Sequence, residues 1–296
     1  MTTAITPTGI LLGQFTPGTP EWEKARGGLC ITATEIAAVL GLSPWQSRFS
    51  LWHKKAGLPS PPFETNPAME WGVRLEPAVA AKYADNHPDL TLHETGTWRH
   101  AQREWQRATP DRIADDRLVE LKTSPTGDEW GPDGDPDGVP IHYRCQTLQQ
   151  MDVLGYRRTD IAVLIGGCDY REYTVWFDET DAQVMRDAAE RFLDDVRHGN
   201  RPDIDDSDAT YQTIRRQPAG REDVDVQIPI DLADRYEATG ANLRAAEAAR
   251  RQAASEVLDL IGSGYRAVCG DRRIAYRTVN PDGTTHALQP YRSTAA

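Results

Sequence analysis

Two carboxylates and a lysine, Asp111, Glu120 and Lys122, stand close together in the stretch ATPDRIADDRLVELKTSP. Residues 104–113 and 117–123 have the composition of two short strands joined by a turn. In an antiparallel hairpin centred on that turn, the two carboxylates face each other across the strands. The lysine projects from the same face as Glu120, because side chains alternate along a strand. The pattern therefore predicts that all three side chains converge, while Val119 and Leu121 point into a core on the other face.

Such a cluster has the chemistry of a metal-dependent hydrolase. Two carboxylates at close range repel, and one stays protonated unless a cation lies between them. Oxygen ligands alone favour Mg²⁺ or Mn²⁺ over zinc. A divalent cation polarises a phosphodiester and lowers the pKa of a bound water, and the lysine orients that water or neutralises developing charge. An exposed hairpin with an ordinary cross-strand charge pattern is the alternative, since short patterns also match by chance.

The surrounding chain predicts helices before and after a mixed central sheet, which makes the fold class α/β or α+β. The first helix has the capping-box pattern of Thr32 and Glu35 and ends at Gly41. The other expected helices follow apolar periodicity over 47–57, 68–85, 142–155, the segment ending at Gly199, and 231–262. Two β-hairpins are expected, over 159–177 and over 265–279.

Glu76 lies on the apolar stripe of the helix over 68–85, beside Gly72, Val73, Val79 and Ala80. A carboxylate that points into a core needs a cation. The alternative is that Pro77 starts a new helical turn and that the carboxylate is favoured there by the helix dipole. The spacing alone does not choose between them.

Three further polar residues have two open interpretations each. Gln146 and Gln150 share a helical face with Tyr143, where the amides contact either a phosphate or solvent. Arg26 precedes the first capped helix, where it either holds a phosphate with the helix N-terminal amides or lies on an ordinary surface.

The net charge of −12 does not favour a nucleic-acid enzyme at first sight. The acidic residues are unevenly placed, however, and residues 1–60 carry five basic against three acidic side chains. This distribution is compatible with a local positive groove on an acidic body. No apolar run reaches the ~18 residues of a membrane span, and the N-terminus lacks a secretory signal. Four scattered cysteines without C-x-x-C spacing indicate reduced thiols and a cytoplasmic location.

The order of these elements resembles the YqaJ-like viral recombinases, the family of phage lambda exonuclease, within the PD-(D/E)xK nuclease superfamily. The resemblance rests on five motifs: WEKARGGLCITATEIAAVLGLSPW (22–45), MEWGVRLEPAVAAKY (69–83), ATPDRI (108–113), VELKTSP (119–125) and IHYRCQTLQQMDVLG (141–155). It implies a restriction-endonuclease-like core with a central mixed β-sheet flanked by helices, followed by a C-terminal helix and β-hairpin appendage.

The expected organisation has four parts. Residues 1–20 form an N-terminal arm, 21–200 the exonuclease core, 201–230 an acidic linker and 231–296 the appendage.

By resemblance, Glu76, Asp111 and Glu120 bind the metal, with the carbonyl of Leu121 as an additional ligand. Lys122 is then the catalytic lysine, and the helix that follows supplies a glutamine at Gln146, which is grouped with the catalytic residues.

The same resemblance places Arg26 where lambda-type enzymes grip the 5′-phosphate, with Thr34 and Thr109 beside that phosphate. Two departures stand out. The usual Pro-Asp-Gly is Pro-Asp-Arg here, so Arg112 adds bulk beside the site. A further aspartate of the lambda-type enzymes has no clear counterpart among His100, Ala101 and Glu104, which leaves the ligands of a second metal open.

The resemblance implies a phage-type, Mg²⁺-dependent 5′→3′ double-strand DNA exonuclease, with Mn²⁺ able to substitute. It acts on duplex ends, prepares 3′ overhangs for a single-strand annealing protein and forms a homotrimeric ring. One alternative is a RecB-like or CRISPR-associated PD-(D/E)xK nuclease, against which the scattered cysteines argue. The other is a non-catalytic DNA-end-binding protein, against which the intact Glu-x-Lys argues.

The C-terminal helix carries an apolar stripe that must be buried against something, formed by Leu232, Tyr236, Leu243, Val257, Leu258 and Ile261. The hairpin after it is basic and is expected to contact DNA through Arg266, Arg272, Arg273 and Arg277. The alternative is a small domain that completes the core or recruits the annealing protein.

Overall fold

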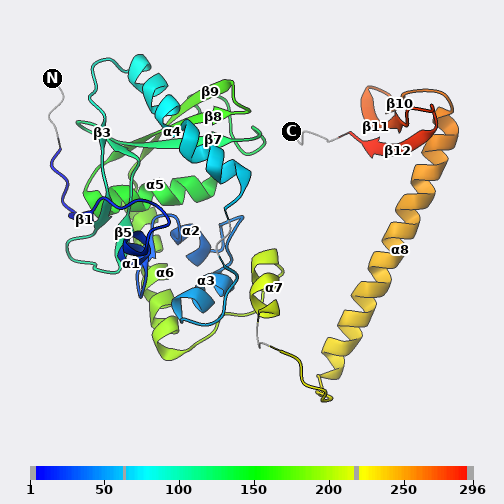
Figure 1. Ribbon diagram of the computed structural model, residues 1–296, viewed down its shortest axis with the longest axis horizontal. Helices are drawn as coiled ribbons and strands as arrows, with labels where there is room; N and C mark the ends of the chain where they lie inside the picture. Colours follow the sequence, from blue (N-terminus) through cyan, green and yellow to red (C-terminus); the bar gives the residue numbers. More distant parts are fainter. Residues whose placement is uncertain (1–4, 63–64, 217–219, 292–296) are drawn as a thin grey trace. The chain divides into compact units, whose positions relative to one another are not determined.

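The computed structural model describes residues 5–62, 65–216 and 220–291. The chain divides into two compact units, residues 1–219 and 220–296, whose helices and strands are labelled in Figure 1. Among the helices of the described ranges, none is both long and apolar enough to cross a membrane.

The first unit is built on a five-stranded sheet in the order β3-β6-β7-β8-β9. Its strands are β3 (His93–Glu94), β6 (Arg112–Ile113), β7 (Leu118–Ser124), β8 (Arg158–Ile165) and β9 (Asp169–Trp176). The β7–β8 pair is parallel and the other pairs are antiparallel. The predicted mixed central sheet is therefore confirmed.

A second sheet has the order β1-β4-β5-β2. Its strands are β1 (Ile10–Gly13), β2 (Ile31–Thr32), β4 (Thr97–Arg99) and β5 (Gln106–Ala108). Strand β1 pairs with β4, so part of the expected N-terminal arm is a strand of this sheet. Residues 1–4 of the arm lie outside the described residues.

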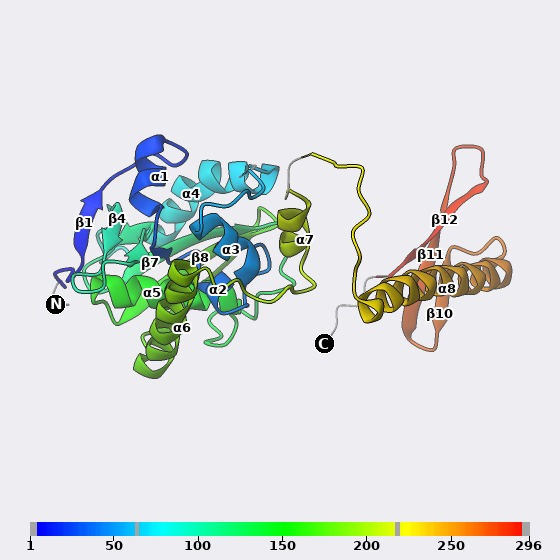
Figure 2. The same ribbon diagram turned by 90° about the horizontal axis from the view of Figure 1, so that it is seen from below.

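Helices cover both faces of the five-stranded sheet (Figure 2). The helices of the first unit are α1 (Pro20–Arg26), α2 (Ile36–Val39), α3 (Arg48–Lys55), α4 (Pro67–Asn86), α5 (Ile141–Leu154), α6 (Glu179–His198) and α7 (Asp208–Arg215). Helix α4 packs on one face, where Val79 and Tyr83 contact Val119, Leu121 and Ala162. On the other face α5 leads into the main core, which also contains side chains of α2 and α6.

The boundaries of α4 and α5 have local causes. Asn66 caps α4 by accepting a hydrogen bond from the Met69 amide, and Pro67 occupies the first turn, where no amide is needed. Helix α5 ends at Gly155, whose φ of 80° suits glycine. Pro77 lies inside the continuous helix α4, so Glu76 does not lie at a helix N-terminus, as the alternative expected.

The segment expected to be one strand over 104–113 is broken. Its two parts, β5 and β6, belong to different sheets. The break falls at residues 109–111, where Pro110 has no amide to donate to a ladder. The loop between the strands therefore carries both Thr109 and Asp111.

The range 201–230 differs from a simple linker. Helix α7 lies within it, and Thr210 and Thr213 are fully buried. The hydroxyls of Thr210 and Ser47 are 2.7 Å apart, which ties α7 to the start of α3. Residues up to Arg216 are therefore part of the packed structure of the first unit.

The second unit consists of a long helix, α8 (Ile230–Ile261), and a sheet in the order β10-β11-β12. The predicted hairpin is present as β10 (Arg266–Cys269) and β11 (Arg272–Val279), and β12 (Thr285–Pro290) extends it by a third strand. Arg277 donates to the carbonyls of Gly262 and Ser263 at the end of α8, at 2.8 and 3.1 Å. Contact of this sheet with DNA stays a prediction.

Candidate active site

Strand β7 presents Glu120 and Lys122 to α5 and turns Val119 and Leu121 toward α4. Arg112 pairs with Val119 and Ile113 with Leu118, so the register continues to the facing positions 111 and 120. The predicted hairpin register is therefore the observed one. Because β6 begins only at Arg112, no strand of the described residues pairs with the edge of β7 beside Asp111.

Glu120 is the most enclosed carboxylate of the cluster, with 1% of the residue exposed. Its Oε1 accepts hydrogen bonds from Lys122 Nζ at 2.5 Å and from Gln146 Nε2. Its Oε2 accepts a hydrogen bond from Gln150 Nε2 at 2.8 Å. Both glutamines are buried, so the interpretation of a solvated polar face on α5 is wrong.

Asp111 lies beside this group on the loop before β6. Its Oδ2 accepts a hydrogen bond from the Leu121 amide at 2.7 Å. Burial, together with the neighbouring charge of Glu120, raises the pKa of Asp111 to about 8, although Lys122 and the Leu121 amide oppose the rise. The two carboxylates thus repel as the sequence predicts, and the charge of Lys122 only partly offsets this repulsion.

Lys122 remains charged in this environment. Burial acts to lower its pKa, but the carboxylates of Glu120 and Asp111 outweigh burial and raise the pKa above the ordinary value. The Nζ atom also lies 4.8 Å from the centre of the Tyr143 ring on α5. The ammonium is therefore held over the carboxylate pair from one side.

The oxygen atoms around Asp111 fit a hard divalent cation. In a strand the amide and the carbonyl of one residue point to the same side. Since the Leu121 amide points at Asp111, the Leu121 carbonyl faces the same open edge of β7. Asp111, Glu120 and this carbonyl offer oxygen ligands only, which suits Mg²⁺ or Mn²⁺. Within the described ranges, however, no three or more Asp, Glu, His or Cys side chains are gathered as a metal site.

The third expected carboxylate, Glu76, is held by a different partner. Arg112 donates from Nη1 to Glu76 Oε1 at 2.8 Å and to the carbonyl of Asp111 at 2.7 Å. The Glu76 side chain is 34% exposed, so it does not point into a closed core, and Val73 beside it is 68% exposed. The residue that departs from the family pattern therefore pairs with the carboxylate expected to bind metal.

Arg26, Thr34 and Thr109 come together although they are distant in sequence. Arg26 donates to the hydroxyl of Thr109 at 3.2 Å and to that of Thr34 at 2.9 Å. Its guanidinium also lies 4.6 Å from the centre of the Trp22 ring, and burial lowers its pKa. Because Thr109 and Asp111 share one short loop, this cluster adjoins the carboxylates.

Some functional side chains were not assigned a role from sequence. Gln150 lies on the same helical face as Gln146, and its contact with Glu120 places it in the site. Thr97, 3.1 Å from the Thr109 hydroxyl, carried no signal because it lies on a separate strand. Glu104, from the region searched for a further carboxylate, pairs instead with Arg99 at 3.1 Å.

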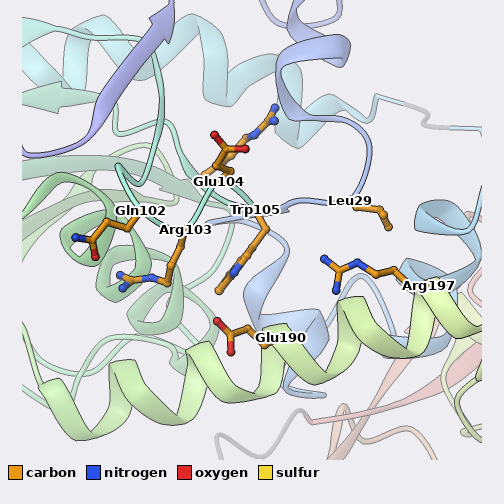
Figure 3. Close-up of a pocket in the computed structure, with 8 residues that line it drawn as sticks. Leu29, Gln102, Arg103, Glu104, Trp105, Glu190 and Arg197 are labelled. Atoms are coloured by element: carbon orange, nitrogen blue, oxygen red, sulfur yellow. The ribbon is translucent and has the colours of Figure 1, made fainter.

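A hollow of about 470 Å³ lies beside α6 (Figure 3). It is lined by Leu29, Gln102, Arg103, Glu104, Trp105, Arg107, Glu190 and Arg197. Asp111, Glu120 and Lys122 are not among its lining residues. The candidate site is thus an open edge of the central sheet and not this hollow.

Comparison with known proteins agrees with the order of the motifs. Residues 21–157 match the model of the YqaJ-like viral recombinase domain. The YqaJ protein of Bacillus subtilis (strain 168) is 27% identical over 215 residues, which cover 68% of this chain and 64% of that protein. The matched region therefore spans slightly less than two thirds of the length of this relative.

Two solved structures are similar to part of this chain. An alkaline exonuclease (LHK-Exo) from Laribacter hongkongensis has a TM-score of 0.48 and 22% identity, over 61% of this chain and 94% of that one. A phage related exonuclease from Haemophilus somnus 129PT has a TM-score of 0.45 and 12% identity, over 58% and 96%.

The matched residues lie in the first unit, which is built on a mixed sheet whose open edge carries two carboxylates and a lysine. The match of residues 21–157 to the YqaJ-like viral recombinase domain confirms the resemblance read from the motifs.

Proposed function

We propose that the chain is a Mg²⁺-dependent 5′→3′ double-strand DNA exonuclease that generates 3′ overhangs for a single-strand annealing protein. Residues 21–200 are its nuclease core, and its active form is a homo-oligomer. The family match supports a DNA nuclease of the phage recombination type. The observation that carries the proposal is the convergence of Asp111, Glu120, Lys122 and Gln146 within that domain.

The oxygen atoms of Asp111, Glu120 and the Leu121 carbonyl would hold the cation, joined by Glu76. A bound divalent cation would polarise the scissile phosphate and lower the pKa of a ligating water. Lys122 orients the attacking water and offsets negative charge at the phosphate. Gln146 and Gln150 hold the Glu120 carboxylate in one rotamer through their amides.

The Arg26 cluster would bind the terminal 5′-phosphate. A guanidinium donates two parallel hydrogen bonds to a phosphate, and the hydroxyls of Thr34 and Thr109 hold it in place beforehand. The short connection from Thr109 to Asp111 then sets a fixed distance between the end group and the carboxylates. This arrangement supports digestion from the 5′ end.

Linear duplexes labelled at either end, incubated with Mg²⁺, Mn²⁺ or EDTA, test the proposal. We expect 5′ labels to be released first, only with a divalent cation. Lys122→Ala should lower the rate by at least about 100-fold because the group near the reacting water is lost. Lys82→Ala is the matched control, because Lys82 is exposed on α4, where its Nζ donates to Asn86 at 2.8 Å and lies 5.9 Å from the centre of the Tyr170 ring.

An inactive wild type that still binds duplex ends would instead support the non-catalytic DNA-end-binding alternative. Wild-type rates in Lys122→Ala would remove the site assignment. Circular dichroism of the variant separates loss of chemistry from loss of fold.

A further inference from the structure

Helix α8 is long and mostly uncovered within its own unit. Its 32 residues span about 48 Å at 1.5 Å per residue. None of them is fully buried. Half-buried apolar side chains gather at its C-terminal end, at Ala254, Val257, Leu258 and Ile261, where the sheet of the second unit begins.

A regular seam runs along the rest of this helix. Steps of four and three residues alternate without a break along Leu232, Tyr236, Thr239, Leu243, Ala246, Arg250, Ala253, Val257 and Leu260. This is the heptad spacing of a coiled coil, in which positions a and d face a partner helix. Its large members are exposed, at 39% for Leu232, 79% for Tyr236, 61% for Leu243 and 87% for Leu260.

An uncovered seam of this kind is costly. Helices in water gain most of their stability from packing an apolar face, and few isolated helices are stable. The sheet covers only the last turns, so the seam from Leu232 to Ala253 needs another partner. The heptad spacing indicates that this partner is a helix.

We propose that a second copy of α8 covers the seam, antiparallel to the first. One register places Leu243 opposite Ala246 of the partner subunit and Tyr236 opposite Ala253 of the partner subunit. In the same register Leu232 faces Val257 of the partner subunit. Each large side chain thus meets a smaller one, which fills the space between two helices evenly.

The charges select the antiparallel orientation. Arg235 and Glu256 occupy the flanking g positions, and the antiparallel register brings each opposite the other across the two copies. Arg250, at position a, then faces Thr239 of the partner subunit. In a parallel pair two Arg250 side chains would meet in the seam, and Arg235 and Glu256 would face Gly240 and Ile261. This self-association does not depend on the proposed nuclease activity.

Position-specific disulfides test the register in the full-length chain. The exposed Cys168 and Cys269 are first changed to serine. Thr239→Cys and Arg250→Cys are then made singly and together, and oxidised with a copper catalyst. A covalent dimer is expected in the double variant and in a mixture of the two single variants. Each single variant alone should stay uncrosslinked, because its two cysteines lie eleven residues apart in this register, about 16 Å.

A dimer formed by Thr239→Cys alone would show a parallel pair and overturn the proposal. Absence of any crosslink, with helicity retained, would show that the nuclease unit or another protein covers the seam, and would overturn it as well.

A charge exchange provides the second test. Arg235→Glu or Glu256→Arg alone should weaken self-association about fivefold, since each puts like charges opposite each other twice per pair. The double variant Arg235→Glu/Glu256→Arg should restore the wild-type value in sedimentation equilibrium. Contacts between nuclease cores do not involve these charges, so they do not alter the differences in self-association among these variants. Failure of the double variant to recover would refute the pairing of Arg235 with Glu256.

Discussion

Arg112 forms an ion pair with Glu76, the carboxylate that the proposed metal site would also use. Replacing Arg112 should therefore strengthen metal binding. Arg112 is 12% exposed and Glu76 34% exposed, and they share a hydrogen bond of 2.8 Å. For a partly exposed, charge-assisted contact we take a stabilisation of about 1 kcal/mol, screened by solvent. A cation that recruits Glu76 must first break this contact. Arg112→Gly, which restores the usual family residue, should therefore raise Mg²⁺ affinity about fivefold.

The measurement is a Mn²⁺ or Mg²⁺ titration of the DNA-free protein, by calorimetry or by the electron paramagnetic resonance of free Mn²⁺. Binding is read directly, so the result does not depend on turnover. The matched control is Arg74→Gln, because the Arg74–Glu70 pair lies on the same helix and is 62% and 60% exposed. It should leave metal affinity unchanged.

A double-mutant cycle assigns the effect to Glu76. Glu76→Gln should weaken metal binding, and Arg112→Gly should have a smaller effect in that background, since the competing ion pair is already absent. Equal or weaker metal binding in Arg112→Gly would refute the competition. That result would mean that Arg112 supports the carboxylates rather than withholding one of them.

Three other perturbations have defined outcomes. Arg26→Ala should abolish a preference for 5′-phosphorylated over 5′-hydroxyl duplex ends, and no such preference in the wild type would contradict the phosphate site. Burial acts to raise the pKa of Asp160, but hydrogen bonds from Arg158 and Tyr83 outweigh burial, so the pKa lies below its ordinary value. Its stabilising contribution is therefore present above the unfolded value of about 3.9 and lost as pH falls through the folded pKa, so Asp160→Asn should show a flatter acid denaturation curve. Changing both Arg266 and Arg273 to glutamine should reduce the slope of log affinity against log salt by about two if the second unit contacts DNA, and an unchanged slope would contradict that contact.

The local sequence pattern was sufficient to predict the register of the β6–β7 hairpin. The alternation of Glu120 and Lys122 with Val119 and Leu121, together with the position of the turn, specifies which side chains face each other. The observed pairing of Arg112 with Val119 follows that register. The long helices α4, α5 and α6 could also be predicted from the sequence, because their apolar periodicity and their caps are properties of consecutive residues.

Contacts between distant segments required the tertiary structure. Arg26 and Thr109 are 83 residues apart, and only the packing of α1 against the β5–β6 loop brings them to 3.2 Å. The burial of Gln150 against Glu120 likewise depends on how α5 lies across the sheet.

Arg112 shows most clearly the difference between what the sequence determined and what the tertiary structure decided. The sequence by itself determined that an arginine replaces the usual glycine beside Asp111. It did not determine that this arginine reaches Glu76 on α4, because a long side chain can point to several partners and the position of α4 over the sheet selects one. Periodicity specifies which face of an element is buried, whereas the partner across that face depends on how whole elements pack together.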